Sequence, residues 1–372
     1  CAGRQPIFCR CLAMNVKMVF ILLWVCLTVA EVARAQGFAD LGTPARGFAE
    51  PQPDYKLRFP ADHGAHPDFR IEWWYLTANL TGPDQTEYGL QWTLFRTALS
   101  QTALSQKANS VWNNAQLWMG HAAVTSPTAH FTAERLARGG IGQAGVTAAP
   151  FEAWIDDWVL EGTGPKTGLG AAALRAGGDD FAYDMQLQAR GPQVLHGQDG
   201  YSVKSADGRA SHYYSQPFFD ISGTLRLPQG VVPVRGQAWL DREWSSSPLA
   251  VSQTGWDWFS LSFAGGDKLM AFQVRDQAGT AFTSATWIAA NGRVKSFGDG
   301  ALTATPLHLT SVAGRRVPTQ WRLQLPDKDL DIRINALNPG AWMDVSLPYW
   351  EGPVRFAGSH TGRGYLEMTG YE

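Results

Sequence analysis

The sequence predicts an all-β protein of two domains, each of them a barrel or a sandwich. Three observations favour this fold class: apolar and polar residues alternate, Gly, Pro, Asn and Asp separate the alternating segments, and long helical patterns are scarce. The 372 residues are 45% hydrophobic and 17% charged, and they include 16 Trp, 10 Tyr and 18 Phe. This composition excludes a disordered chain, and the length is typical of two domains.

The N-terminal segment has the pattern of a secretory signal peptide. A short basic start precedes an apolar run over residues 18–30, and Ala33 and Ala35 supply the small residues of a cleavage site. We therefore expect residues 1–35 to be upstream residues plus the signal peptide, and the protein to be periplasmic or secreted. All four cysteines lie in this segment, so we expect the exported part to have no disulfide and no thiolate nucleophile: Cys1, Cys9, Cys11 and Cys26.

The rest of the chain is predicted to be strands after a leader arm at residues 36–53. The clearest period-two alternation occurs in residues 69–75, 90–94, 181–188, 256–261 and 330–334. Short helices fit the pattern only in residues 98–118 and 168–177.

The domain boundary is expected where alternation is lost between two prolines and two glycines. The segment PQGVVPVRG at residues 228–236 has the composition of a linker or a long turn. It would divide an N-terminal domain of residues 54–238 from a C-terminal domain of residues 239–372. Each of these predicted domains contains one strand with two tryptophans, which is consistent with two related barrels.

Several function classes are excluded by charge and by missing motifs. The formal net charge is −2, and no long run of Lys or Arg occurs, which argues against nucleic acid as a partner. The chain has no GxGxxG after a strand, no GxxxxGK[ST], no HExxH and no GxSxG. These absences argue against nucleotide-binding, zinc-protease and serine-hydrolase readings, and we expect no cofactor.

The first candidate segment, residues 59–79, is rich in polar and aromatic groups. His63 and His66 have the HxxH spacing of a metal site, but a single pair of loop histidines more often forms hydrogen bonds, and we expect no metal. Glu72 fits either a catalytic carboxylate or a buried ion pair with Arg96, and we favour the ion pair.

The second candidate segment, residues 211–215, places His212 and Tyr214 on one face of a strand. The two side chains could orient a substrate or move a proton. The alternative is that both are half-buried strand residues with satisfied polar ends.

The third candidate segment, residues 236–246, is the most informative. Trp239, Asp241 and Glu243 share one face of the predicted strand, and Arg242 and Trp244 lie on the other. Burial in an apolar cavity would raise the pKa of one carboxyl, which could then protonate an alkene beside aromatic rings that stabilise a carbocation. The alternative is an ion pair of these carboxylates with Arg242 or Arg275 that fixes a domain junction.

Five blocks of the sequence resemble the family of carotenoid 1,2-hydratases (hydroxyneurosporene synthases) and AttH-like secreted proteins: FPADHGAHPDFRIEWWYLTANL, SHYYSQPFFDISGTL, GQAWLDREWSS, GWDWFSLSF and GSHTGRGYLEMTGY. The resemblance implies two consecutive lipocalin-like (calycin-type) antiparallel β-barrel domains. It also implies, for the hydratase members, cofactor-independent addition of water to the terminal double bond of an acyclic carotenoid, with a carboxylic acid as proton donor.

The resemblance also assigns residues. The block with the hydratase acid matches Trp239 to Asp241, and the preceding His-x-aromatic block matches His212 to Tyr214. This chain departs from the hydratases after the aspartate, where Arg242 begins an Arg-Glu-Trp sequence, and it is therefore closer to the AttH-like branch. An arginine beside Asp241 is expected to favour the ionised carboxylate and to weaken it as a proton donor.

These observations leave two main hypotheses for an exported protein that binds a hydrophobic isoprenoid or lipid-like molecule, for which peripheral membrane contact is possible. The first is an acid-catalysed hydratase. The second is a non-catalytic lipid carrier or envelope-assembly accessory protein. A weaker third is a carbohydrate-binding protein. In the hydratase hypothesis the catalytic residues are Asp241, His212 and Tyr214. The substrate would contact Trp239, Glu243, Trp244, Trp258 and Trp73.

Overall fold

The computed structural model describes residue 41 and residues 45–100, 114–164 and 168–371. The predicted signal peptide and its four cysteines lie outside these residues. Within the described ranges the chain forms strands and two short 3₁₀ helices, Ala61–His63 and Pro326–Lys328, with no α-helix. The predicted all-β class is therefore confirmed. No helix among the residues described has the length and apolar character needed to cross a membrane.

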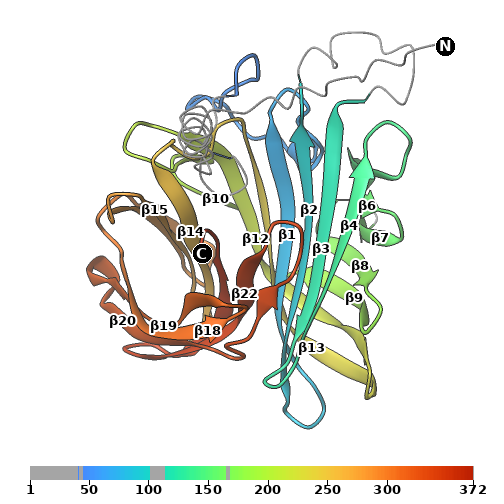
Figure 1. Cartoon of the computed structure of the whole chain (residues 1–372), viewed down its shortest axis with the longest axis vertical. Helices are drawn as coiled ribbons and strands as arrows, with labels where there is room; N and C mark the ends of the chain where they lie inside the picture. Colours follow the sequence, from blue (N-terminus) through green and yellow to red (C-terminus); the bar gives the residue numbers. More distant parts are fainter. Residues whose placement is uncertain (1–40, 42–44, 101–113, 165–167, 372) are drawn as a thin grey trace, which may run out of the picture.

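The first sheet is a nearly closed antiparallel barrel (Figure 1). Its strands are β1 (Ile71–Thr81), β2 (Glu87–Ala98), β3 (Gln116–Thr125), β4 (His130–Arg138), β5 (Ala144–Ala148), β6 (Phe151–Ile155), β7 (Trp158–Gly162), β8 (Ala171–Gly177), β9 (Ala182–Ala189), β10 (Val194–Leu195), β11 (Tyr201–Val203), β12 (Ala210–Leu227) and β13 (Gly230–Ser245). They follow the order β4-β3-β2-β1-β13-β12-β9-β8-β7-β6-β5, and β10 and β11 pair with β12. Contacts between β4 and β6 bring the two ends of the sheet together.

The second sheet is a half-barrel built from the C-terminal strands. These are β14 (Gln253–Phe263), β15 (Lys268–Asp276), β16 (Ala281–Ile288), β17 (Val294–Phe297), β18 (Thr303–Val312), β19 (Arg315–Leu325), β20 (Leu330–Ala336), β21 (Trp342–Met343), β22 (Tyr349–Gly358) and β23 (Gly362–Met368). Their order is β17-β16-β15-β14-β23-β22-β20-β19-β18, and β21 pairs with β22. The two sheets match the predicted pair of consecutive lipocalin-like barrels.

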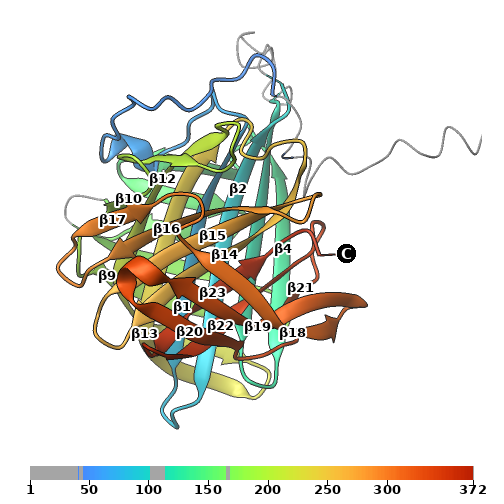
Figure 2. The same ribbon diagram turned by 90° about the vertical axis from the view of Figure 1, so that its left-hand side faces the viewer.

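The two sheets pack with the outer face of the first against the outer face of the second (Figures 1 and 2). Alternation assigns the faces: Trp74 of β1 belongs to the core inside the first barrel, whereas its neighbour Trp73 packs in a third cluster between the sheets. In β14, Phe259 belongs to the core of the second sheet and Trp258 to the cluster between the sheets. The central strands are therefore covered on both faces, which explains their paired tryptophans.

Close backbone approach holds the sheets together at one point. A Cβ atom at Gly89 of β2 would lie 2.6 Å from the ring of Pro353 and 2.8 Å from the hydroxyl of Tyr365. Only glycine fits this contact without displacing the second sheet. Charged pairs flank it, because Glu87 binds both Arg355 and Arg363.

The predicted linker at residues 228–236 is instead the turn between the two longest strands and the first part of β13. Its prolines and glycines therefore mark a hairpin. The sheets divide the chain between Ser245 and Gln253, so the expected boundary at residues 238 and 239 lies within β13.

The predicted helix at residues 168–177 is wrong, because most of it forms β8. Ala172, Leu174 and Ala176 alternate into the core of the first barrel, and this burial outweighs the helix propensity of alanine. The other predicted helix lies largely outside the described residues, and its ends belong to β2 and β3.

Candidate functional site

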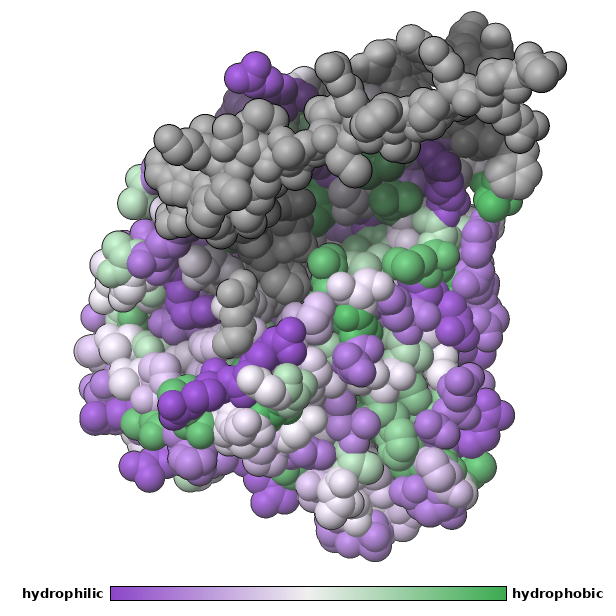
Figure 3. Space-filling model, in the orientation of Figure 1, coloured by the Kyte–Doolittle hydropathy of each residue, from purple (hydrophilic) through white to green (hydrophobic). Residues whose placement is uncertain are grey.

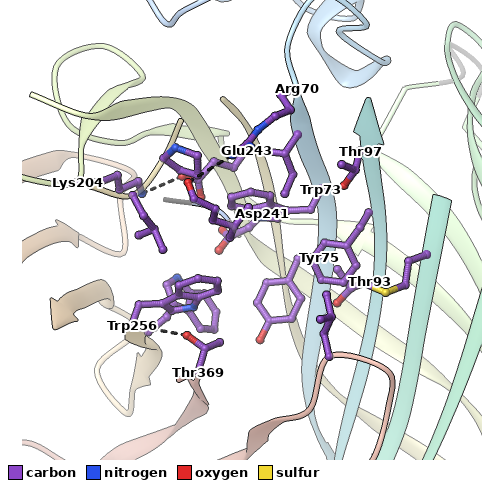
Figure 4. Close-up of a pocket in the computed structure, with 18 of the residues that line it drawn as sticks. Arg70, Trp73, Tyr75, Thr93, Thr97, Lys204, Asp241, Glu243, Trp256 and Thr369 are labelled. Carbon is purple, nitrogen blue, oxygen red and sulfur yellow. Dashed lines mark hydrogen bonds and ion pairs between the residues drawn. The ribbon is translucent and has the colours of Figure 1, made fainter. Parts of the chain in front are cut away.

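A cavity of about 720 Å³ lies between the two sheets and is lined mainly by apolar and aromatic side chains (Figure 4). The first sheet contributes Trp73, Tyr75 and Phe95, among others, and the second contributes Trp258 and Phe272. The surface on this side of the molecule is hollowed, with apolar residues in the wall of the hollow (Figure 3). A volume of this size is typical of sites for small organic ligands.

Asp241 on β13 presents a buried carboxyl to this cavity. Its Oδ2 accepts a hydrogen bond of 2.6 Å from the Tyr213 hydroxyl, and its Oδ1 accepts one of 2.6 Å from the Trp239 indole and another from the Ser215 hydroxyl. Burial raises the pKa of Asp241 to about 7, and the charge of Glu243 adds to this rise, although the three donors lower the pKa. The carboxyl is therefore partly protonated at neutral pH.

The expectation that Arg242 ionises Asp241 is wrong. Arg242 points to the opposite face of β13, where its guanidinium binds Glu72 and lies 3.8 Å from the ring centroid of Trp74. Adjacent residues on a strand face in opposite directions, so proximity in sequence does not bring the two charges together.

A second polar residue stands behind the acid. His196, which the sequence analysis did not single out, places Nε2 2.5 Å from the Ser215 hydroxyl, and Ser215 in turn donates to Asp241. The imidazole is fully buried, and burial and the charge of Lys204 hold its pKa well below the usual range. Within the described residues its Nδ1 has no hydrogen-bond partner. Neutral His196 therefore fixes the orientation of the serine that binds the acid.

Glu243 lines the same cavity but is paired with a cation. The Lys204 ammonium lies 2.8 Å from Glu243, and it also lies over the rings of Tyr213 (4.6 Å) and Phe272 (4.2 Å). The sequence predicted an arginine as the alternative partner of these carboxylates, and the structure gives Glu243 a lysine from the loop before β12. Glu243 is therefore the acid of the cavity that pairs with Lys204.

The second sheet supplies another acid, Glu367 on β23, which sequence reasoning missed. It lines the cavity and accepts a hydrogen bond of 2.5 Å from the Trp256 indole. Burial raises its pKa to about 7, and the charges of Asp241 and Glu243 add to the rise. The only indication of Glu367 in the sequence was that it lies in GSHTGRGYLEMTGY, one of the five blocks that resemble the family.

The predicted residues His212, Tyr214 and Trp244 do not line the cavity. They lie on the reverse face of β12 and β13, where the Tyr214 hydroxyl is 2.6 Å from Nδ1 of His63 and Trp244 stacks on His66 at 3.9 Å. The structure therefore separates His212 and Tyr214 from Asp241. Of the predicted substrate contacts, Trp73, Glu243 and Trp258 line the cavity, and Trp239 holds Asp241.

The reverse face is a buried polar network that braces three strands. Glu72 of β1 binds Arg96 of β2, as the sequence predicts, and also Arg242 of β13. The two guanidinium groups hold the pKa of Glu72 well below its usual range, although burial alone would raise it. The loop histidines His63 and His66 form hydrogen bonds there. No group of three or more metal-ligating side chains occurs in the part of the chain described.

Fold and site together define the class: a protein of two lipocalin-like barrels with an acid-lined apolar cavity between them. The chain belongs to the AttH-like family, which matches residues 50–371. Comparison with curated proteins gives no significant match.

Two solved structures share the fold. A protein from Nitrosomonas europaea described as AttH is 32% identical, with a TM-score of 0.78 over 87% of this chain and 99% of that chain. Kievitone hydratase from Nectria haematococca is 15% identical, with a TM-score of 0.63 over 87% of this chain and 98% of that chain.

Proposed function

We propose that this protein is an exported, cofactor-independent hydratase that binds an isoprenoid or lipid-like alkene in the cavity between its sheets. The observation that carries the proposal is the buried carboxyl of Asp241, whose pKa lies near 7 and which faces an apolar cavity. A carboxyl that is protonated at neutral pH can donate a proton to an alkene. The kievitone hydratase structure supports the proposal at the level of the shared fold.

The cavity is suited to the cation that protonation of an alkene produces. Trp73, Tyr75 and Trp258 present aromatic rings to the same space as Asp241. Aromatic faces attract a cation through their quadrupoles, and the attraction is stronger where water is excluded. Proton transfer from Asp241 would give a tertiary carbocation, and water would capture it to form the alcohol.

The test is Asp241→Asn, assayed with lycopene in detergent micelles and chromatographic detection of hydrated product. We expect turnover to fall at least about 100-fold while lycopene still binds, because the amide keeps the size of the carboxyl but cannot donate an acidic proton. The matched control is Asp184→Asn, an exposed aspartate of β9, which should keep wild-type turnover. Full activity of Asp241→Asn would rule out its role as proton donor.

The second candidate function is a non-catalytic lipid carrier. The observation that favours it is that both Oδ atoms of Asp241 are already held by protein donors, as in a structural carboxylate. Mass spectrometry of the organic extract from protein purified from its own host distinguishes the two. An unmodified lipid at stoichiometric amount, with no hydration of lycopene, would establish the carrier.

A further inference from the structure

Asp241 and Glu367 occupy opposite walls of one cavity. Asp241 lies on β13 of the first sheet, and Glu367 lies on β23 of the second. A short chain of contacts joins them: the Tyr213 hydroxyl donates to Asp241 at 2.6 Å, and the Trp258 indole donates to Tyr213 at 3.0 Å. Trp258 is the direct cross-strand partner of Glu367 in the pairing of β14 with β23. Tyr213 and Trp258 therefore link the two acids across the contact between the sheets.

The two acids share two features of their surroundings. Each accepts a hydrogen bond from an indole, Asp241 from Trp239 at 2.6 Å and Glu367 from Trp256 at 2.5 Å. Neither forms an ion pair with a lysine or arginine among the residues described. Of the cations in the cavity wall, Lys204 binds Glu243, and Arg46 and Arg70 also line the wall. Two carboxylates that line one apolar cavity repel each other, and with no cation paired to either of them this repulsion favours the protonated form.

We propose that Glu367 is a second catalytic carboxyl, which forms an acid–base pair with Asp241 across the cavity. This inference rests on the proposed hydratase function and assigns the residue that activates water. The pair would accept a substrate whose double bond lies between the two walls, with Asp241 on one side and water beside Glu367 on the other.

The step is balanced with water as the co-reactant. The O–H bond of Asp241 breaks and a C–H bond forms on the alkene, which leaves a carbocation. A C–O bond then forms between the cation and water, and one O–H bond of that water breaks as its proton passes to Glu367. The product is the alcohol, and transfer of the proton from Glu367 to Asp241 restores the starting state. The reverse sequence is dehydration.

The charged groups around the pair agree with this assignment. Burial raises the pKa of both acids to about 7, and the charge of Asp241 raises that of Glu367. Glu243, paired with Lys204, acts on both acids. Burial holds several nearby groups neutral, because it raises the pKa values of Tyr75, Tyr213, Tyr349 and Glu351 well above the usual range and lowers that of His121. The cations Arg46 and Arg70 also line the cavity.

The test is an infrared pH titration of the protonated carboxyl stretch in the intact protein without ligand. We expect Glu367→Gln to lower the midpoint at which Asp241 ionises by roughly one pH unit, because a neighbouring negative charge is removed. The amide oxygen can still accept the Trp256 hydrogen bond. By reciprocity, Asp241→Asn should lower the midpoint of Glu367. The control is Glu152→Gln, an exposed residue of β6, which should change neither midpoint.

Unchanged midpoints in both variants would overturn the pair. If Glu367→Gln does not fold, Asp241→Asn still measures the coupling between the two acids.

Turnover of lycopene distinguishes failure of the acid–base pair from failure of the proposed hydratase function. We expect Glu367→Gln to lower kcat at least about 100-fold with little change in lycopene affinity. Wild-type turnover in this variant would overturn the role of Glu367 and leave the hydratase function standing. No turnover in the wild-type protein would overturn both.

Discussion

Two buried carboxyls of this protein show how neighbours decide protonation. Glu72 and Asp241 are both almost fully buried, and they lie on adjacent strands. Glu72 contacts two guanidinium groups and has a lowered pKa, whereas Asp241 contacts only neutral donors and has a pKa of about 7. Burial disfavours the ionised form in both cases, and a paired cation reverses that effect only for Glu72. The pKa of Asp241 thus stays raised because no cation is paired with this carboxyl.

The raised pKa of Asp241 predicts a specific pH dependence of stability. Between its ordinary value near 4 and its folded value near 7, the folded state binds more protons than the unfolded state, so this residue's contribution to stability falls as pH rises. Asp241→Asn removes that titration. We expect the free energy of unfolding of the variant, relative to wild type, to increase between pH 4 and pH 7 by about 1 kcal/mol or more.

Urea denaturation at several pH values measures this difference. Asp184→Asn serves as the control, since this exposed residue should give a difference that is nearly independent of pH. A constant difference between wild type and Asp241→Asn would show that Asp241 titrates at its ordinary pKa in the folded protein.

Tyr213 tunes the same acid. Its hydroxyl donates to Asp241, and a donor favours the ionised carboxylate. Tyr213→Phe should therefore raise the pKa of Asp241, by roughly one pH unit for a single buried hydrogen bond. Infrared titration of the carboxyl reads the change, with Tyr201→Phe on β11 as the control. A lowered midpoint would contradict the assigned direction of this hydrogen bond.

Part of the site could be predicted residue by residue. Period-two alternation correctly placed Trp239, Asp241 and Glu243 on one face. It also correctly paired His212 with Tyr214, but alternation does not say which face of a strand meets the cavity. The pairing of β12 with β13 decides that, because it brings Ser215 opposite Asp241 and Tyr213 opposite Glu243. Glu367 could not be found this way, since its approach to Asp241 depends on how two separate sheets pack.

At the scale of elements, β13 serves different purposes on its two faces. One face carries the acids of the cavity, and the other carries Arg242, which joins β13 to Glu72 of β1 and through it to Arg96 of β2. Because these ion pairs fix the reverse face of β13, the strand holds Asp241 in a fixed position. The departure from the hydratase pattern after the aspartate thus affects both faces of β13: Arg242 belongs to the scaffold behind the site, and Glu243 lines the cavity.

Breaking this brace should be costly. Glu72→Gln leaves two buried guanidinium groups without their carboxylate, and we expect it to lower the free energy of unfolding at pH 7 by about 3–5 kcal/mol. The control, Glu161→Gln, breaks an exposed pair with Arg175 and should cost less than about 1 kcal/mol. Urea midpoints measure both. Equal costs for the two variants would show that the buried network does not brace the barrel.

Two predictions about individual elements were wrong because they relied on local composition, whereas burial in the sheet decided the structure. Residues 168–177 are rich in alanine and suggested a helix, yet β8 places alternate residues in the barrel core. Proline and glycine at residues 228–236 suggested a linker, yet they form a hairpin between long strands. The fold class survived both errors because it rests on alternation throughout the chain.

At the scale of the whole molecule, the contact between the sheets builds the cavity. The sequence indicated two barrels, and the structure places the cavity between their outer faces, while both interiors are filled by their own cores. Single-strand patterns predict which residues alternate, but they contain no information on which outer faces meet. The paired tryptophans were the signal that these strands are covered on both sides.

Gly89 should control this contact. A methyl group there would press on Pro353 and Tyr365, so Gly89→Ala is expected to destabilise the protein by about 1–3 kcal/mol and to loosen the sheets. Calorimetry should show one unfolding transition for wild type and a broadened or divided one for the variant. Gly265→Ala, which would meet no atom within 4 Å, is the control. A single sharp transition in Gly89→Ala at the wild-type temperature would contradict this account.

The contact at Gly89 also sets the width of the cavity and therefore the size of the ligand it can hold. The walls of the cavity belong to separate sheets, and the spacing between them is set where β2 meets β22, away from Asp241 and Glu367. We expect a substitution there to change the angle between the two walls, while each acid keeps its position on its own strand. We therefore expect changes at this contact to widen or narrow the cavity without altering the chemistry of the acids.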